Sequence, residues 1–79
     1  RDLQVGAYYS NGEVGEHWSV RRIIDASESD ARRPQLIVKT VAGPGRGDIQ
    51  VVLRKAFLSW GKYQVVPDGG AWRRLDGED

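Results

Sequence analysis

The stretch from Ile49 to Val66 constrains the fold most strongly, because two strand-like runs flank one helical turn and leave no room for a true loop. The first run has the period of two that is typical of a half-buried strand, with Ile49, Val51 and Leu53 alternating with Gln50, Val52 and Arg54. Phe57 and Trp60 lie three residues apart and would share one face of a short helix near residues 55–60. Gly61 follows at a position where a helix can end in the left-handed conformation. The stretch therefore predicts a mainly β fold that contains one short helical turn.

Four further runs of strand-like residues extend this unit to an antiparallel arrangement of five or six strands. They cover residues 3–10, 17–25, 35–41 and 71–75. Asn11-Gly12 and the segment 67–70 carry turn-forming residues, which favour hairpin connections between neighbouring strands. Short strands joined in this way, together with a single helical turn, favour a small barrel over a sandwich.

The segment from Ala26 to Arg33 is rich in charged residues and serine, and Pro34 ends it. Because proline favours an extended residue before it, we predict a loop here. A short helix in the same segment is the alternative, since Ser27 and Asp30 have a capping spacing. The segment has no apolar stripe that would hold such a helix against a core, so the loop is the preferred interpretation.

Length and composition narrow the function classes. A chain of 79 residues has room for one domain, here with a core over 3–75 and an acidic tail, 76–79, that we expect to fray. It has no cysteine and one histidine, so we expect no disulfide, no metal and no cofactor. A core this small gives little net stability, so a homo-oligomer is expected. No apolar run approaches the about 20 residues that cross a bilayer, and we expect no membrane contact and a cytoplasmic location.

Positive charge and aromatic side chains are the candidate binding features. Residues 3–75 carry eleven basic and seven acidic side chains, and nine of the twelve cations of the chain are arginine. Arginine beside exposed aromatic rings suits bases, phosphates or peptide groups. Tyr9, Trp18 and Trp60 are expected in the core from their alternation, which leaves other rings for the surface. The predicted binding residues are Tyr8, Arg21, Arg46, Tyr63, Trp72, Arg73 and Arg74. The alternative is that Trp72 covers the end of the barrel and that the arginines are only solvated.

Two motifs offer chemistry of a different kind. The loop from Gly43 to Gly47 has three glycines whose amides can turn toward a phosphate, but Pro44 removes one donor, and a flexible strand connection is the preferred interpretation. The lysine and hydroxyl of a P-loop are missing from it. His17 is the only imidazole, and a nearby serine with Asp25 would complete a Ser-His-Asp set, but no sharp nucleophile turn accompanies them. We therefore predict no catalytic residue.

The order of strands, the loop from Gly43 to Gly47 and the helical turn over 55–60 resemble SH3-like barrels across about residues 3–75. The resemblance implies a small barrel, and SH3-like modules bind peptides, methylated side chains, RNA or DNA. The plasmid-type dihydrofolate reductases are similar in length and fold and form their active site in a tetramer pore. Where they carry Val-Gln-Ile-Tyr, this chain has Ile49-Gln50-Val51-Val52. Residues 6–12 and 17–21 also resemble short bacterial proteins of no known activity, which implies a bacterial, cytoplasmic setting.

These observations leave three hypotheses open. The first is a non-enzymatic binding module whose arginines and aromatic rings bind nucleic acid or, in second place, a protein or peptide. The second is a small oligomeric enzyme with a site between subunits around His17 or Gln50. The third is an assembly domain whose aromatic surface forms the subunit contact.

Overall fold

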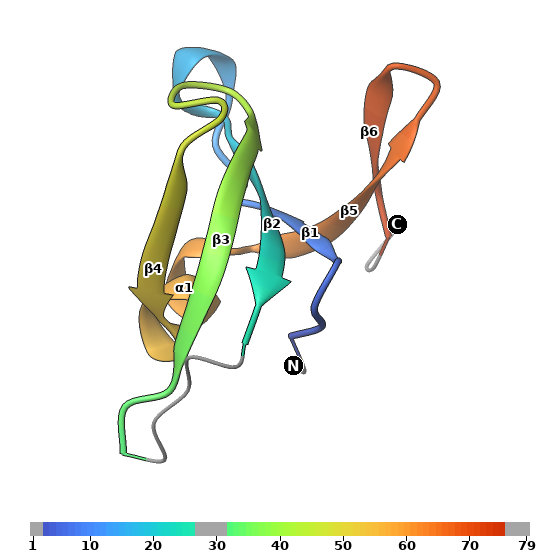
Figure 1. Cartoon of the computed structure of the whole chain (residues 1–79). Helices are drawn as coiled ribbons and strands as arrows, with labels where there is room; N and C mark the ends of the chain where they lie inside the picture. Colours follow the sequence, from blue (N-terminus) through green and yellow to red (C-terminus); the bar gives the residue numbers. More distant parts are fainter. Residues whose placement is uncertain (1–2, 27–31, 76–79) are drawn as a thin grey trace.

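The computed structural model describes residues 3–26 and 32–75 of the chain (Figure 1). Its elements are β1 (Tyr8–Ser10), the 3-10 turn η1 (Gly15–His17), β2 (Val20–Asp25), β3 (Gln35–Ala42), β4 (Ile49–Leu53), α1 (Arg54–Trp60), β5 (Tyr63–Asp68) and β6 (Ala71–Arg74). The six strands form one antiparallel sheet in the order β4-β3-β2-β1-β5-β6. Within the described residues, the predicted mainly β class and the predicted short helix near residues 55–60 are confirmed. The predicted loop over 26–33 lies largely outside the described residues, and the tail 76–79 lies wholly outside them.

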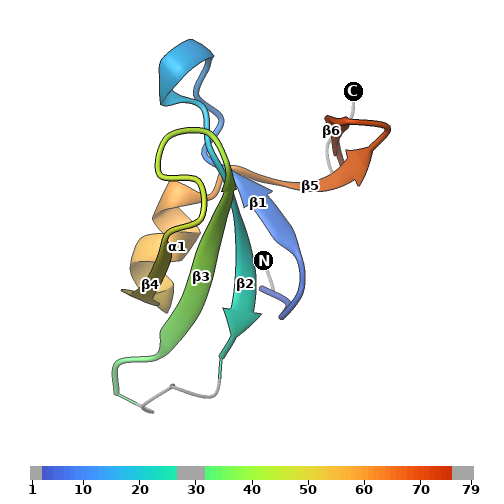
Figure 2. The ribbon, with the colours of Figure 1, turned by 45° about the horizontal axis from the view of Figure 1, so that its top comes forward.

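The core lies between α1 and one face of the sheet, which we call the inner face (Figure 2). The buried cluster consists of Tyr9, Ile23, Leu36, Val38 and Phe57, which come from three strands and the helix. Within β3 the buried side chains recur at every second residue, so the predicted strand period holds. Phe57 meets the ring of Tyr9 edge-on, with ring centroids 5.6 Å apart and an interplanar angle of 89°.

The three aromatic residues expected in the core differ in burial. Tyr9 is fully buried, whereas Trp60 is half-buried and packs on Phe57 with ring centroids 5.5 Å apart. Trp18 is also half-buried, in the connection that precedes β2. The core is therefore centred on Tyr9 and Phe57, and Trp60 covers one side of it.

The first strand is shorter than the alternation of residues 3–10 predicts. Gly6 has φ +90°, and Ala7 N–H donates to the carbonyl of Gln4 at 3.1 Å, so the chain turns before the strand begins. Gly6 N–H also donates to the carbonyl of Ile23 at 2.7 Å, which holds this turn against β2. The run was read as one strand because its apolar spacing continues through the turn.

The connection between β1 and β2 is not a tight Asn-Gly hairpin turn. It is a longer loop that is held by hydrogen bonds of the Asn11 side chain. Gly12 has φ +74°, but Asn11 stays at negative φ. The amide group of Asn11 donates to the carbonyl of His17 at 2.8 Å and accepts from Ser19 N–H at 3.1 Å. Because η1 occupies part of the predicted second strand, β2 starts three residues later than the sequence pattern predicts.

Gly61 does not end α1 in the left-handed conformation, so that prediction is wrong. Its φ is −81° and its ψ is 113°, which is extended backbone. The chain enters β5 almost at once, and a side chain at this position would lie 3.4 Å from both the Tyr9 Cβ and the Phe57 carbonyl oxygen. Gly61 therefore packs closely against Tyr9 and Phe57 and does not form a left-handed turn.

β5 and β6 form a hairpin that extends beyond the rest of the sheet (Figures 1 and 2). β1 pairs with β5 only as far as Val65, so beyond it β5 pairs with β6 alone. Gly69 and Gly70 close the hairpin with φ of +59° and +87°, which matches a two-residue turn of the primed type. The predicted turn in this region is therefore confirmed, and it produces a two-stranded arm.

Candidate binding face

A row of side chains crosses the sheet on the face opposite the core, which we call the outer face. Tyr8 lies there because its neighbour Tyr9 points into the core and successive strand residues point to opposite faces. Residues directly opposite each other on paired strands share a face. The pairing therefore aligns an outer row from β3 to β6, consisting of Lys39, Arg22, Tyr8, Val65 and Arg74.

The centre of the outer row is a stack of one guanidinium and two rings. The guanidinium carbon of Arg22 lies 5.1 Å from the centroid of the Tyr8 ring. Tyr8 in turn contacts Trp72, with ring centroids 5.2 Å apart and an interplanar angle of 53°. Arg22 Nε also donates to the carbonyl of Gly6 at 3.1 Å, which orients the side chain over the ring. The stack is therefore held by contacts at each end and links β2, β1 and β6.

A second cation and ring pair lies on the same face at the other end of the outer row. Arg74 places its guanidinium carbon 4.3 Å from the centroid of Tyr63. Tyr63 is opposite Ser10, two residues from Tyr8, so the two tyrosines share the outer face. Val65 lies opposite Tyr8 on β5, two residues after Tyr63, and is only 3 % exposed. The outer face thus combines a small apolar centre with aromatic rings and cations around it.

The charges of the outer row have one sign. Lys39, Arg22 and Arg74 are exposed, and no acidic residue occupies a position in the row. Arg22 and Arg74 are separated by three strand spacings of about 4.8 Å, a span of roughly 14 Å. An elongated anionic ligand that lies across the strands would meet the cations in turn, and its planar groups would meet the rings.

Arg21, a predicted binding residue, lies on the inner face and not beside Tyr8. Its guanidinium carbon is 4.3 Å from the Trp60 ring centroid, and its paired residue on β1 is the buried Tyr9. Nε of Arg21 is buried without a hydrogen-bond partner among the described residues, and burial lowers the pKa of this guanidinium. The pairing of β2 with β3 shifts register between Val20 and Arg21, which changes the phase of the strand. Arg21 therefore contributes to the core side of the sheet.

Arg73 is also turned away from the outer row. It follows Trp72 and precedes Arg74 on β6, so it points to the opposite face. Its Nε lies 3.3 Å from a carboxylate oxygen of Asp68, and both side chains are largely exposed. An exposed pair of this kind adds little stability, but it neutralises the charge of Arg73.

Arg46 lies in the exposed loop between β3 and β4, where the structure argues against a phosphate cradle. Three amides of this loop already donate to backbone carbonyls, those of Arg46, Gly47 and Asp48. The carboxylate of Asp48 lies beside Gly45, where it would repel an anion. The preferred interpretation from the sequence, a strand connection, therefore describes this loop.

His17 offers no catalytic constellation in the part of the chain that the structure describes. Its imidazole is 78 % exposed, and its Nε2 lies 3.9 Å from a carboxylate oxygen of Glu16, which is 90 % exposed. Among residues 3–26 and 32–75, no group of three His, Cys, Asp or Glu side chains could hold a metal ion. Over the same ranges, no helix has the length and apolar character needed to cross a membrane.

Arg22 and Lys39 lie in the outer row but are not among the binding residues that the sequence predicts. The signal for Arg22 was present, because one member of each adjacent arginine pair must point to the same face as the exposed rings. The choice between Arg21 and Arg22 depended on a register shift that alternation alone does not reveal. Lys39 joins the row only through the pairing of β3 with β2.

The comparisons with known proteins supply no family for this chain. No protein-family model, no curated protein and no solved structure matches it. Function is therefore inferred from the geometry of the outer face.

Proposed function

We propose that this chain is a non-enzymatic binding module that holds single-stranded nucleic acid on its outer face. The observation that carries the proposal is the placement of two arginine and ring pairs, Arg22 on Tyr8 and Arg74 on Tyr63, on one face of the sheet. Single-stranded nucleic acid is bound by proteins that combine a cationic track for the backbone with rings on which bases stack. The outer row and the half-buried ring of Trp72 provide both kinds of group.

Nucleic acid is favoured over a peptide by the charge of the row. Three cations without an acidic neighbour in the row match a ligand with one negative charge per repeating unit. Each phosphate that is neutralised on a single strand adds about 0.7 to the slope of log affinity against log salt, so three contacts predict a slope of roughly −2. A peptide of low charge would give a nearly flat response.

The test is fluorescence anisotropy with a labelled oligothymidylate and a labelled oligouridylate of about 12 nucleotides, within the range that small folds of this type bind. The affinity should fall with the slope given above between about 50 and about 200 mM salt. Absence of binding at low salt, or binding that salt leaves unchanged, would contradict the proposal.

Two variants, one that removes two cations of the outer row and a control that removes one cation elsewhere, assign the binding to the outer face. Arg22→Gln combined with Arg74→Gln should lower the affinity for the oligonucleotide by about tenfold. It should also reduce the magnitude of the slope of log affinity against log salt by about 1.4, since two phosphate contacts are lost. Arg46→Gln removes an exposed arginine from the loop between β3 and β4 and should leave both quantities unchanged. Equal losses in the two proteins would show only a general effect of net charge.

The SH3-like resemblance is supported by the strand order. β1 lies between β2 and β5, and α1 joins β4 to β5 directly, which is the arrangement that the resemblance implies. β6 is then an addition beside β5, and it carries Trp72 and Arg74. An NMR structure in which β5 did not pair with β1 would contradict this proposal.

Self-association is a second candidate, favoured by the free edge of β4. β4 ends the sheet on one side, and its Ile49 and Val51 are 64 % and 59 % exposed. A sheet edge with exposed apolar residues is a ready surface for pairing with a second copy. Sedimentation should then show a dimer that Val51→Lys dissociates, whereas a monomer at micromolar concentration would remove this candidate.

A further inference from the structure

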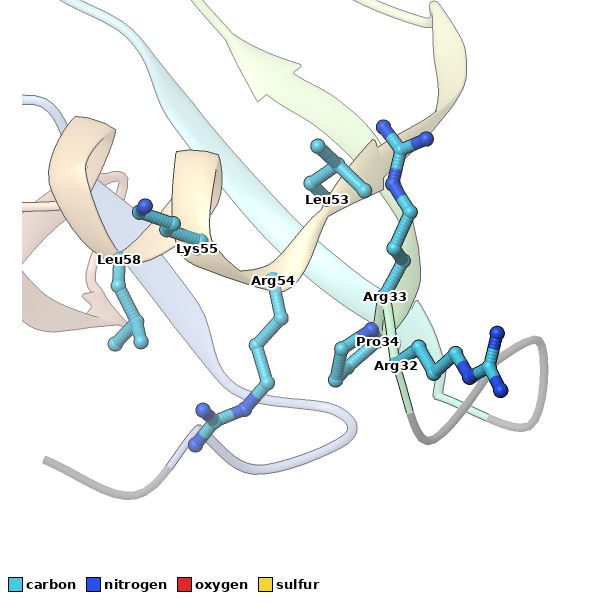
Figure 3. Close-up of a pocket in the computed structure, with 7 residues that line it drawn as sticks. All are labelled: Arg32, Arg33, Pro34, Leu53, Arg54, Lys55 and Leu58. Carbon is cyan, nitrogen blue, oxygen red and sulfur yellow. The ribbon is translucent and has the colours of Figure 1, made fainter.

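A second basic site lies at the end of the molecule where β3 begins and β4 meets α1 (Figure 3). It is a pocket of about 460 Å³. Its basic lining residues are Arg32, Arg33, Arg54 and Lys55, and its apolar lining residues are Pro34, Leu53 and Leu58. The outer row uses none of these residues, so the pocket is a separate feature.

The pocket is created by the register of the β3–β4 hairpin. Gln35 pairs with Leu53, and Arg54 N–H donates to the carbonyl of Pro34 at 2.8 Å, which continues the hairpin by one step. The basic pair Arg32-Arg33 is thereby brought beside the basic pair Arg54-Lys55, although about twenty residues separate them in the sequence. The concentration of charge therefore results from the fold.

The lining has an apolar base and a cationic rim. Figure 3 shows Pro34 at the centre, and the guanidinium groups of Arg32, Arg33 and Arg54 point outward in different directions. Separated charges of this kind fit carboxylates spaced along an extended chain better than they fit one compact anion. Pro34, Leu53 and Leu58 supply apolar surface against which an aliphatic side chain of a ligand can pack.

The contrast with the outer row indicates the class of ligand. Among the described residues, neither an aromatic ring nor an acidic side chain lines the pocket, so bases would find no stacking partner in this lining. Arg33, Arg54 and Lys55 form no ion pair within the described part of the chain, unlike Arg73 with Asp68. These three cations therefore have charge to offer an external acidic partner.

We propose that this pocket docks an acidic peptide segment of a partner protein, with one bulky aliphatic side chain of the segment over Leu53 and Leu58 and its carboxylates on Arg33, Arg54 and Lys55. The cations select acidic sequences, and the concave apolar base selects the side chain between the acids. The proposal concerns a surface and a partner class that differ from those of the nucleic-acid proposal, so each can fail without the other.

The experiment uses the full chain and a fluorescent synthetic peptide in which one leucine is flanked on both sides by aspartate and glutamate. Anisotropy should show saturable binding. The same peptide with alanine in place of leucine should bind at least about fivefold more weakly, because the apolar contact is lost. Chemical-shift changes in the full chain should centre on the residues of the pocket.

Arg33→Glu combined with Lys55→Glu tests the cations, since both side chains are exposed and neither belongs to the core. The affinity of this variant for the leucine peptide should be at least about tenfold lower than that of the parent protein. Arg46→Glu, a control that reverses one exposed charge outside the pocket, should stay within about twofold of the parent protein. The variant with Arg33→Glu and Lys55→Glu should still bind the oligonucleotide, because the outer row contains neither residue.

Three outcomes would overturn the proposal. The first is no binding of the leucine peptide, and the second is equal affinity for the leucine and alanine peptides. The third is a ligand of another class at this pocket, recognised when vesicles of phosphatidylserine, or the oligonucleotide, lose binding on Arg33→Glu with Lys55→Glu while the peptide does not.

Discussion

Arg21 and Arg22 are adjacent in β2, carry the same side chain and each lie over an aromatic ring, yet they face opposite sides of the sheet. Arg21 is half-buried over Trp60, with Nε enclosed and its pKa lowered by burial. Arg22 is exposed over Tyr8, in a row of cations. On the inner face the cation over a ring is part of the core side of the sheet, whereas on the outer face it stays accessible to solvent. Burial decides which of the two applies.

The largest loss of stability, and so the clearest difference between the inner and outer faces, is expected for Phe57→Ala. Phe57 is 1 % exposed at the centre of the inner cluster, and removing its ring should cost about 3–5 kcal/mol of unfolding free energy. A domain of this size has little stability to spare, so the variant should be largely unfolded. Urea denaturation followed by tryptophan fluorescence measures the loss. A loss below about 1.5 kcal/mol would mean that the inner face does not carry the fold.

A smaller and local effect is expected from Trp72→Ala on the outer face. The change removes the contact with Tyr8 that ties the two-stranded arm to β1 and should cost about 1–2 kcal/mol. Hydrogen exchange should show faster exchange for the amides of residues 66–73, while β2 and β3 keep their protection. Trp72→Phe, which keeps a ring, should recover most of the protection. Uniform loss of protection over all strands would show that the outer face belongs to the global core.

The smallest effects should come from exchanging each of the two arginines for methionine. Arg21→Met replaces a partly buried cation by an apolar chain of similar length and should change the unfolding free energy by less than about 1 kcal/mol, because the cost of burying the charge offsets the lost ring contact. Arg22→Met should have a smaller effect on stability, since the side chain is exposed. Urea titrations measure the unfolding free energy of each variant, and anisotropy measures its affinity for the oligonucleotide.

Only Arg22→Met should lower the affinity for the oligonucleotide, because Arg21 lies on the core side of the sheet. Equal losses of affinity in the two variants would erase the distinction between the faces. A loss of more than about 2 kcal/mol for Arg21→Met would instead reveal a stabilising partner for its charge.

Much of the fold follows from local patterns of the sequence. β3 is recognisable because Leu36 and Val38 recur at alternate positions among β-branched residues, and α1 because Phe57 and Trp60 share one helical face. Gly69 and Gly70 predict the closing turn of the arm because both can adopt positive φ. These features depend only on residues that are close together in the sequence, so the sequence of this chain is enough to predict them.

The candidate site is less accessible to such reasoning. Tyr8, Tyr63, Trp72 and Arg74 were selected as surface residues, and the structure places all four on one face. Arg21 and Arg73 point to the other face, and Arg46 belongs to a separate loop. Whether any of these residues binds a ligand stays a prediction.

The sequence by itself determined the class of the fold, the positions of most strands and the helix, and the supply of arginines and rings. It determined them because alternation, helical spacing and turn propensity are local properties of the backbone and its side chains. The tertiary structure decided which of two adjacent arginines meets Tyr8 and which two basic pairs share a pocket. Both decisions depend on strand register, and a shift of one residue in register sends a side chain to the opposite face.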